Sequence, residues 1–487
     1  MVQKEEIKII IVGAGASGIA AGTKLLENGF NNITILEAEN RIGGRINSVE
    51  FGGSVVDIGG QWVHGEKNNI IYEMVKDLDL IAPSSLPPDP GMSFFLPNGT
   101  SPDKTITDKL FATAIKVKDD KETASRYRGN FAEYFTTEYK KRVKEDFFPA
   151  DEDILQLSDL VLDWFKKFMI LLNPAESWNQ LSTTSHYVFQ PCEGDPLLGW
   201  KGKGYKTIID VMKKKIPDPS KELPIDNKII VNKEVNRIIW NRSTDDKVIV
   251  KCSDGSKYSA DHVIVTVSVG VLKDVYKKVF EPALPNKKVN AIENVPLGTV
   301  NKILLKFPYK WWPSTVKDIS FLWSEEDKES LREFSSGPVV NGRSWLENLF
   351  SFIAIDSHPN VLLGWVNGPT SKLVELLPDE SVISGAMYML RKFAGKQFDI
   401  PEPNGILRSK WGSNPHFRGS YTYVSANMEN AKASANDLAE PLIAHSKPAV
   451  LFAGESTHAT LFSTVSGAME TGYREAQRII DFYRKNA

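Results

Sequence analysis

Short, unbroken apolar runs recur along the chain and predict buried strands of a parallel sheet. They cover Ile7–Val12, Ile33–Leu36, 261–267 and 449–453. Strands of this kind are typical of parallel sheets. Helices cover both faces of such a sheet, so neither face is exposed to water and apolar residues do not alternate with polar ones. An Ala-rich stretch after the first run predicts a helix that ends at Asn28-Gly29. The pattern therefore predicts an α/β fold.

The remaining segments carry other patterns. Residues 229–240 and 247–250 predict antiparallel strands, and Asp254-Gly255 predicts the hairpin turn that follows them. Apolar residues at helical spacing predict several helices within 103–215 and one over 380–395. Shorter, aromatic-rich strands are expected at Val300–Phe307, Ile319–Trp323 and Val361–Val366. Because these segments interrupt the parallel strands, the domain built on the parallel sheet is expected to be discontinuous.

A glycine-rich turn separates the first predicted strand from the first helix, and an acid ends the second strand. The turn is Gly13-Ala14-Gly15-Ala16-Ser17-Gly18, and Glu37 follows 24 residues after Gly13. Gly13 allows the tight turn, Gly15 lets a pyrophosphate approach the backbone, and Gly18 lets helix and strand pack closely. The helix N-terminus offers N–H groups and partial positive charge to the phosphates. Glu37 would accept hydrogen bonds from ribose hydroxyls and repel a 2′-phosphate, which argues against NADP.

The motif alone leaves a choice between a dinucleotide site and a βαβ unit whose glycines only permit packing. The segment Arg41-Ile42-Gly43-Gly44-Arg45 follows the acid and favours FAD, because it adds two glycines for close backbone approach and a guanidinium suited to phosphate. A solvated basic loop would not explain the paired glycines between the arginines.

Composition excludes several other classes of function. The 59 basic and 61 acidic residues nearly cancel, and no run of like charge suggests a nucleic-acid tail or a membrane anchor. No apolar run approaches the ~20 residues of a membrane span, and the N-terminus enters the first strand without a secretory signal. The seven histidines are scattered, so no metal site is expected. Two cysteines, Cys192 and Cys252, cannot form a disulfide framework, and a cytoplasmic location is the default.

Further stretches, together with the glycine motif, carry a resemblance to a known family. They are Asp57–Gly65, Pro296–Lys302, Trp411–Tyr421, Phe452–His458 and Ser463–Ala468. The chain resembles the flavin-containing amine oxidases, and in particular the polyamine oxidases of animals, from residue 9 to beyond 480. The resemblance implies a Rossmann-like FAD-binding domain with an inserted α+β substrate-binding domain. Residues 1–75, 225–290 and 445–487 are expected to form the first domain, and residues 76–224 and 291–444 the second.

The resemblance assigns the chemistry mainly to Lys302. In the family the matching lysine holds a water against flavin N5. Period-two alternation puts Lys302 on one face of its strand with Val300 and Leu304. A lysine there is unfavourable unless it is paired or hydrated, and a surface lysine like Lys306 is the alternative. His64 matches a histidine placed near the substrate amine, although a lone histidine is more often a structural residue.

The resemblance also implies the remaining contacts. FAD contacts are expected from Gly13, Gly15, Ser17, Gly18, Glu37, Ala38, Arg45, Gly60, Gln61, Trp62, Val235, Trp411, Gly454, Glu455, Thr464 and Val465. Tyr421 is expected to face the substrate, with Thr464 where several relatives carry a second aromatic residue. Glu193 and Asp195 are candidates to hold a distal ammonium, against the alternative of a solvated turn. Ser456 stands where some related oxidases attach FAD to a cysteine, so the FAD is expected to be non-covalent.

The resemblance therefore implies oxidation of a secondary amine in spermine or in N1-acetylated polyamines. The imine would hydrolyse to an aldehyde and a shorter amine, and O₂ would be reduced to H₂O₂. The expected partners are the polyamine and O₂, without nucleic acid or membrane, and the chain is expected to be a monomer or a weak dimer. Two alternatives stay open. One is another flavin amine or amino-acid oxidase of the same fold, and the other is a non-catalytic FAD-binding protein that acts through a partner.

Overall fold

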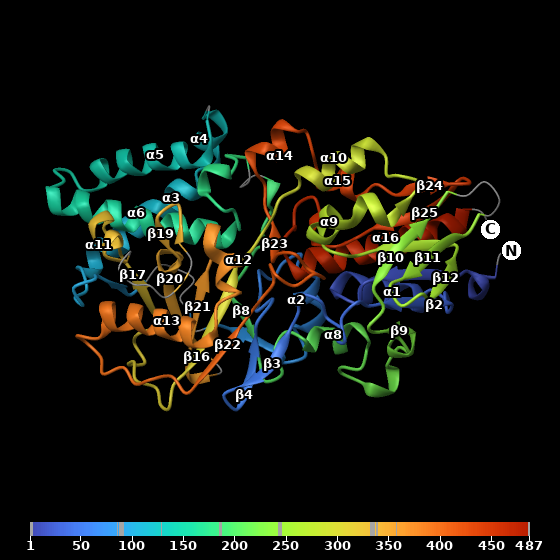
Figure 1. The fold of residues 1–487 in the computed structure, drawn as a ribbon, viewed down its shortest axis with the longest axis horizontal. Coiled ribbons are helices and arrows are strands. Elements are labelled where there is room, and N and C mark those ends of the chain that lie inside the picture. Colours follow the sequence, from blue (N-terminus) through green and yellow to red (C-terminus); the bar gives the residue numbers. More distant parts are fainter. Residues whose placement is uncertain are drawn as a thin grey trace.

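The chain forms two lobes along its longest axis, and both termini lie at the end of one lobe (Figure 1). The computed structural model describes residues 3–84, 86, 92–127, 129–184, 188–241, 246–331, 337, 339–356 and 358–485. Each lobe is built on its own six-stranded sheet. The contacts that position the candidate site come from both lobes and from the loops between them.

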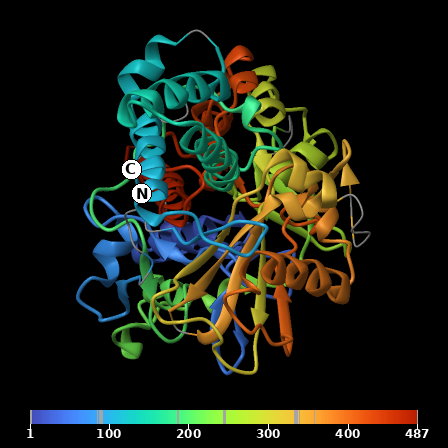
Figure 2. The same cartoon turned by 90° about the vertical axis from the view of Figure 1, so that its left-hand side faces the viewer.

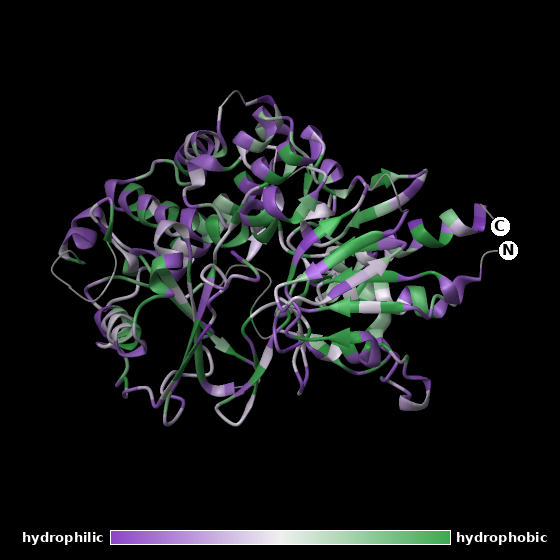
Figure 3. Cartoon of the chain, turned by 45° about the vertical axis from the view of Figure 1, so that its right-hand side comes forward, coloured by the Kyte–Doolittle hydropathy of each residue, from purple (hydrophilic) through white to green (hydrophobic). Residues whose placement is uncertain are grey.

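The first lobe contains the predicted parallel sheet, which confirms the α/β assignment. Its strands lie in the order β24 (Leu442–Ala444), β25 (Lys447–Phe452), β13 (His262–Val265), β1 (Ile9–Val12), β2 (Ile33–Leu36) and β9 (Ile229–Ile230). All neighbours are parallel except β24, which pairs antiparallel with β25 at one edge. The central strands β1 and β13 are buried along their whole length, and the strands of this lobe are largely green in Figure 3.

One strand prediction is wrong in part. The sequence predicts 229–240 as antiparallel, but Ile229 and Ile230 pair in parallel with β2 at the edge of the main sheet. Asn232 then adopts φ 55°, and this left-handed residue redirects the chain. A separate four-stranded sheet follows, formed by β12 (Lys257–Ala260), β11 (Val248–Cys252), β10 (Val235–Ile239) and β14 (Phe280–Glu281). Its β11–β12 hairpin confirms the turn predicted at Asp254-Gly255.

Two helices pack closely beside the glycine turn. The helix α1 (Ala16–Glu27) ends at Asn28-Gly29 as predicted, and α16 (Val465–Lys485) is the last helix of the chain. A Cβ at Gly18 would lie 2.0 Å from the carbonyl oxygen of Gly13, and a Cβ at Gly472 would lie 2.1 Å from that of Ser17. Both glycines are therefore needed for α1 to approach the turn and α16.

The second lobe contains an aromatic-rich sheet between two layers of helices. Its strands lie in the order β22 (Gly405–Arg408), β16 (Asn301–Lys306), β21 (His358–Val366), β20 (Leu349–Ile355), β17 (Asp318–Phe321) and β7 (Phe94–Phe95). One face packs against the helices α3 (Lys104–Asp119), α4 (Lys121–Arg126), α5 (Phe131–Asp146) and α6 (Glu152–Leu172). The other face packs against α13 (Asp379–Ala394), and Figure 2 shows these helices and the sheet from the end of the lobe. The helices predicted within 103–215 and over 380–395 are confirmed.

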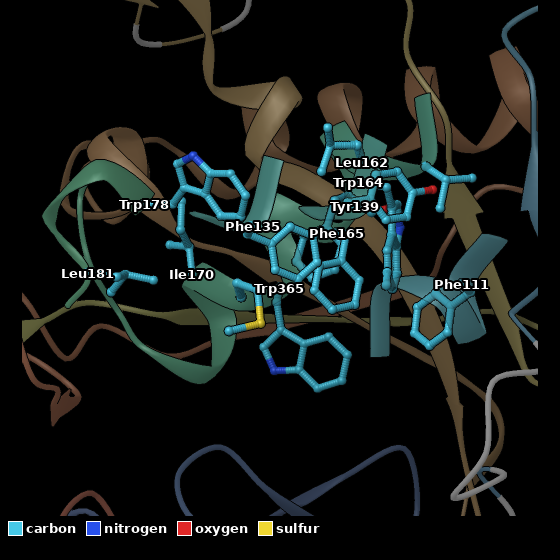
Figure 4. Close-up of a cluster of buried hydrophobic side chains, with 14 of the residues drawn as sticks. Phe111, Phe135, Tyr139, Leu162, Trp164, Phe165, Ile170, Trp178, Leu181 and Trp365 are labelled. Atoms are coloured by element: carbon cyan, nitrogen blue, oxygen red, sulfur yellow. The ribbon is translucent and has the colours of Figure 1, made fainter. Parts of the chain in front are cut away.

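The alternation predicted for the strand that contains Lys302 is confirmed. Val300 and Leu304 join the core beneath α5 and α6, whereas Ile303 and Leu305 join the core beneath α13. Figure 4 shows the first of these cores, with Trp365 of β21 at its lower edge. Lys302 therefore shares the face of the sheet that carries Trp365.

Shorter elements connect these layers. In the first half of the chain they are β3 (Ser48–Phe51), β4 (Ser54–Asp57), β5 (Trp62–Val63), α2 (Ile70–Val75), β6 (Ile81–Pro83), β8 (Leu198–Trp200) and α8 (Thr207–Met212). In the second half they are α9 (Val269–Val279), α10 (Asn286–Asn294), β15 (Leu297–Gly298), α11 (Glu325–Ser330), β18 (Val339–Val340), β19 (Arg343–Ser344), α12 (Ser371–Val374), β23 (Tyr421–Thr422), α14 (Ala426–Asn430) and α15 (Ala435–Ala439). None of the helices in the described ranges is long and apolar enough to span a bilayer. The domain boundaries proposed from the sequence stay a prediction.

Candidate functional site

Residues predicted to bind FAD gather at the carboxyl ends of the parallel strands. Gly13 follows β1, Glu37 follows β2, Thr266 follows β13 and Gly454 lies just after β25. Open α/β sheets bind their ligands at this edge. Gly13 has φ 106°, and a Cβ there would lie 2.5 Å from Thr266 Oγ1, so the tight turn requires glycine.

Backbone N–H groups hold the buried carboxylate of Glu37. The N–H of Ala14 donates to Oε2 at 2.7 Å, and the N–H of Glu39 donates to Oε1 at 2.8 Å. Burial raises the pKa of Glu37, and these two hydrogen bonds oppose that rise. Each oxygen keeps a second lone pair that can accept a ribose hydroxyl.

Three other predicted contacts lie around this acid and the turn. Ala38 follows Glu37 directly. The N–H of Lys233 donates to the carbonyl oxygen of Glu37 at 2.7 Å, which brings Val235 at the start of β10 near the acid. Ser17 is buried on α1, and its hydroxyl lies 3.5 Å from that of Thr471 on α16.

The backbones of two glycine turns, at Gly13 to Gly18 and at Gly43-Gly44, line the side of the site where phosphates would lie. Gly15 and Gly43 form a parallel bridge, and the N–H of Gly43 donates to the carbonyl oxygen of Ala14 at 2.9 Å. A Cβ at Gly15 would be in ordinary van der Waals contact with backbone atoms of Gly43 and Gly44, the nearest being Gly44 Cα at 3.9 Å. This turn is therefore lined by glycine backbone, and a pyrophosphate can approach main-chain N–H groups of such a turn.

An ion pair fixes the guanidinium of Arg45. Its Nη1 donates to Glu455 Oε1 at 2.9 Å and to the carbonyl oxygen of Ser420 at 2.7 Å. The other carboxylate oxygen of Glu455 accepts from the hydroxyl of Thr422 at 2.7 Å and from the N–H of Ser463 at 2.9 Å. Glu455 therefore anchors Arg45, and its direct contact with FAD stays a prediction. The glycine-lined turn, the buried acid and the anchored guanidinium together fit FAD.

Lys302 is buried and its ammonium is fully hydrogen-bonded. Only 8% of the residue is exposed. Its Nζ donates to the carbonyl oxygens of Asp57 and Gly59 at 2.8 and 2.9 Å and to Gln61 Oε1 at 2.6 Å. These three acceptors use all three N–H groups of the ammonium. Lys302 is therefore not a surface lysine, and Gln61, predicted as an FAD contact, lies against it.

Burial disfavours the charged form of Lys302. Burial lowers the pKa of Lys302 to about 8, and the carboxylate of Asp57 partly opposes that fall. Burial also raises the pKa of Asp57 to about 6, although the hydroxyl of Ser48 and the N–H of Tyr205 donate to its carboxylate. Both groups can therefore exchange protons near neutral pH.

The loop after β4 lies between the two lobes. A Cβ at Gly59 would lie 3.2 Å from Trp411 Cζ2, and a Cβ at Gly60 would lie 3.2 Å from Val465 Cγ2. The indole N–H of Trp411 donates to the carbonyl oxygen of Ile58 at 3.2 Å. The structure thus brings Gly60, Trp411 and Val465 together, although they lie far apart in the sequence.

Thr464 caps the N-terminus of α16 at this loop. The N–H of Gly467 donates to Thr464 Oγ1 at 2.9 Å, which is the geometry of a helix N-cap. The positive end of the helix dipole therefore lies beside Gly60, where it favours negative charge. Whether Thr464 also contacts substrate stays a prediction.

Aromatic residues lie on the same side of the sheet as Lys302. The Trp62 ring centroid lies 6.0 Å from Lys302 Nζ and 6.3 Å from the ring of Trp365. Trp365 is the cross-strand neighbour of Lys302 on β21, and its ring points out of the core in Figure 4. The hydroxyl of Tyr421 donates to the carbonyl oxygen of Leu171, which fixes its ring at the edge of the same core.

The loops 64–67 and 192–196 form one rim of the site. His64 is exposed, and its Nδ1 lies 2.7 Å from the carbonyl oxygen of Pro196, so Nδ1 carries a proton and donates. Neutral His64 then offers a lone pair at Nε2. Asp195 accepts at its carbonyl oxygen from the N–H of Gly65 at 2.8 Å, and at Oδ1 from that of Leu197 at 2.8 Å. The carboxylate of Glu193 is 73% exposed and pairs with Lys67 at 3.0 Å. His64, Glu193 and Asp195 are thus close together.

Sequence reasoning misses two residues of this site. Asp57 begins the glycine-containing stretch Asp57–Gly65, and an acid directly before Ile-Gly-Gly is a signal that could have singled it out. Trp365 lies in a predicted strand, but the strand pairing that puts it beside Lys302 has no local sequence signal. Across the described part of the chain, no cluster of three or more His, Cys, Asp or Glu could hold a metal ion.

Comparisons with known proteins agree with this geometry. A family model described as flavin containing amine oxidoreductase matches residues 16–480. The human peroxisomal N(1)-acetyl-spermine/spermidine oxidase is 28% identical, over 98% of this chain and 95% of its own length. The probable polyamine oxidase 5 of Arabidopsis thaliana is 27% identical, over 99% of both chains. A solved putrescine oxidase double mutant shares the fold with a TM-score of 0.65 at 18% identity, over 98% of this chain and 99% of its own.

Proposed function

Because the chain belongs to the flavin-containing amine oxidoreductases and uses FAD, we propose that it oxidises a secondary amine of a polyamine. Spermine and N1-acetylated polyamines are the proposed substrates, since the human relative is named for acetylated polyamines. FAD supplies the acceptor for the hydride that leaves the carbon beside the nitrogen. The imine then hydrolyses to an aldehyde and a shorter amine, and O₂ is reduced to H₂O₂.

The observation that carries this proposal is the environment of Lys302. Its Nζ is held by the loop that also contacts Trp411 and Val465, so the lysine head lies beside the residues proposed to frame the flavin. A lysine with a pKa of about 8 can accept or donate a proton at working pH. We propose that Lys302 positions a water at this point and moves its proton.

The aromatic rings and His64 are proposed to orient the amine. Trp62, Trp365 and Tyr421 offer ring faces and edges to an alkyl chain or to an ammonium. The free lone pair of His64 Nε2 can accept a hydrogen bond from an amine N–H. The reacting nitrogen must be neutral, because hydride departure needs its electron pair. Activity is therefore expected to rise from pH 7 towards alkaline pH.

Glu193 and Asp195 are proposed to attract the distal ammonium of the substrate. Glu193 would exchange its exposed pairing with Lys67 for the ammonium, which costs little because exposed ion pairs contribute only ~0–1 kcal/mol. Asp195 keeps Oδ2 for a second partner while Oδ1 accepts from Leu197. Removing the two charges should raise KM for spermine more than for a monoamine.

The other proposals concern the state of the protein. FAD is proposed to be non-covalent because Ser456 replaces the cysteine that would tether it. The chain is proposed to be cytoplasmic and a monomer or weak dimer, acting on a small amine and O₂ without nucleic acid or membrane.

A substrate panel tests the proposed function. Peroxide release should be fastest with spermine or N1-acetylated polyamines and slow with simple monoamines and amino acids. A preference for amino acids would replace the proposal with an amino-acid oxidase of the same fold. Absence of peroxide with every amine, in a protein that retains FAD, would favour a non-catalytic flavoprotein.

A further inference from the structure

A small cavity lies behind the loop that holds Lys302. Its volume is about 70 Å³, and its described lining includes Asp57, Gln61, Trp62, Trp200, Ser84 and Asp356. A single water needs roughly 10–15 Å³ of such space, so the cavity has room for several waters.

The inner end of the cavity reaches the partners of Lys302. Asp57 and Gln61 both line the cavity, and Lys302 Nζ donates to the backbone carbonyl oxygen of Asp57 at 2.8 Å and to Gln61 Oε1 at 2.6 Å. Trp200 also lines the cavity, and its buried indole N–H has no acceptor within the described residues. A buried N–H in a polar cavity is typically satisfied by an ordered water. The inner lining therefore favours water over an empty apolar void.

The outer end of the cavity reaches solvent. The hydroxyl of Ser84 donates to Asp356 Oδ2 at 2.8 Å, and the Asp356 side chain is exposed. The cavity thus lies between Asp57, whose carboxylate interacts electrostatically with Lys302, and a carboxylate at the surface. Carboxyl groups and waters arranged one after another along a cavity can transfer protons.

We propose that this cavity is a water-filled proton route between solvent and Lys302, and that Asp57 is the positioning acid at its inner end. The proposal rests on the proposed function, because it gives Lys302 a route to regain or lose the proton that it handles. In each transfer one N–H or O–H bond breaks and one O–H or N–H bond forms, with the electron pair staying on the donor. No oxidant or second reactant is needed.

The charges around Asp57 support the route. Lys302 and Lys206 are the cations that face its carboxylate, and Ser48 and the N–H of Tyr205 donate to it. The Asp57 charge in turn raises the pKa of Lys302 against the effect of burial. Removing that charge while keeping the shape should therefore lower the pKa of Lys302 further.

The test compares Asp57→Asn with Asp318→Asn in the FAD-loaded protein. Asp318 is a matched control, because burial raises its pKa to about 6, as it does for Asp57, but Asp318 does not line the cavity. The flavin is reduced with dithionite and mixed with O₂, and the reoxidation rate is measured against pH. No amine is present, so the result does not depend on which substrate the enzyme takes.

We expect Asp57→Asn to move the midpoint of the pH profile to lower pH by about one unit, the usual scale for a nearby charge. Gly199→Val, which puts a side chain on the cavity lining, should slow reoxidation without moving that midpoint. Asp318→Asn should match wild type in both respects. Equal midpoints for wild type and Asp57→Asn, or equal shifts in the two Asn variants, would overturn the proposal.

Thermal unfolding gives a second readout that does not depend on activity. Asp57 has a raised pKa in the folded protein, so the folded state binds more protons than the unfolded state between pH 4 and about 6. Wild type should therefore lose stability relative to Asp57→Asn as the pH rises through this window. A constant difference in Tm across the window would show that Asp57 does not titrate as the route requires.

Discussion

Replacing Lys302 by Met should sharply slow turnover in a protein that still folds and binds FAD. Methionine matches the length and apolar stem of lysine but removes the head that contacts Asp57, Gly59 and Gln61. A group that positions and transfers a proton contributes about 10²–10⁴-fold to rate, which is about 3–5 kcal/mol of activation free energy. We expect turnover of a polyamine to fall by that factor.

The loss of stability in the mutant is limited because two effects oppose each other. Burial lowers the pKa of Lys302 from 10.5 to about 8, so holding the charge at neutral pH costs the fold about 3 kcal/mol, which the mutant recovers. The mutant loses hydrogen bonds from a charged donor, which contribute about 1.5–3 kcal/mol each, and leaves their buried acceptors unpaired. The three hydrogen bonds together contribute about 4.5–9 kcal/mol, so the free energy of unfolding should fall by about 1.5–6 kcal/mol.

Stopped-flow measurement separates the two half-reactions of the mutant. The rates of flavin reduction by amine and of reoxidation by O₂ are compared with wild type and with Lys306→Met, a control four residues along the same strand. At least one rate should fall more than tenfold in Lys302→Met, with FAD content unchanged, and neither should fall in the control. Wild-type values for both rates would refute the catalytic role of Lys302.

Three further predictions concern the cofactor site. Glu37→Gln keeps the size of the side chain, but its single carbonyl oxygen can accept from only one of the N–H groups of Ala14 and Glu39, and its NH₂ group repels the other. The free energy of FAD binding, measured by titration of the apoprotein, should therefore weaken by about 1–3 kcal/mol, and unchanged affinity would remove Glu37 from the site. Gly18→Ala forces a Cβ to within 2.0 Å of a carbonyl oxygen, so denaturation should show a free energy of unfolding lower by about 1–3 kcal/mol. In the control Gly405→Ala the nearest atom to the new Cβ is 3.5 Å away, and the free energy of unfolding should be nearly unchanged. Acid precipitation should release the flavin into the supernatant because no cysteine tethers it, and yellow pellets would contradict that expectation.

Local sequence patterns were sufficient for most of the parallel sheet of the first lobe and for its first helix. The apolar runs, the glycine turn and the stop at Asn28-Gly29 all act within a few residues, so the parallel strands and α1 could be predicted. Ile229 and Ile230 were misassigned because the partner of a two-residue strand depends on tertiary pairing with β2 rather than on its own alternation.

The site was less predictable than the fold. Lys302 could be placed on a buried face from period-two alternation, but its three acceptors come from a loop more than 240 residues earlier in the chain. Glu455 illustrates the same difficulty, since its carboxylate anchors Arg45, Thr422 and Ser463 rather than standing open to a ligand. Such contacts depend on how the two lobes meet, and no local pattern encodes that.

The proposed transfer of a hydride from a polyamine to FAD can be followed directly by mixing the purified yellow protein with spermine or N1-acetylspermine in the absence of O₂. We expect the flavin absorbance to bleach with at least one of these amines and to return when O₂ is admitted. A flavin that stays oxidised with every polyamine, while dithionite still reduces it, would contradict the proposed transfer.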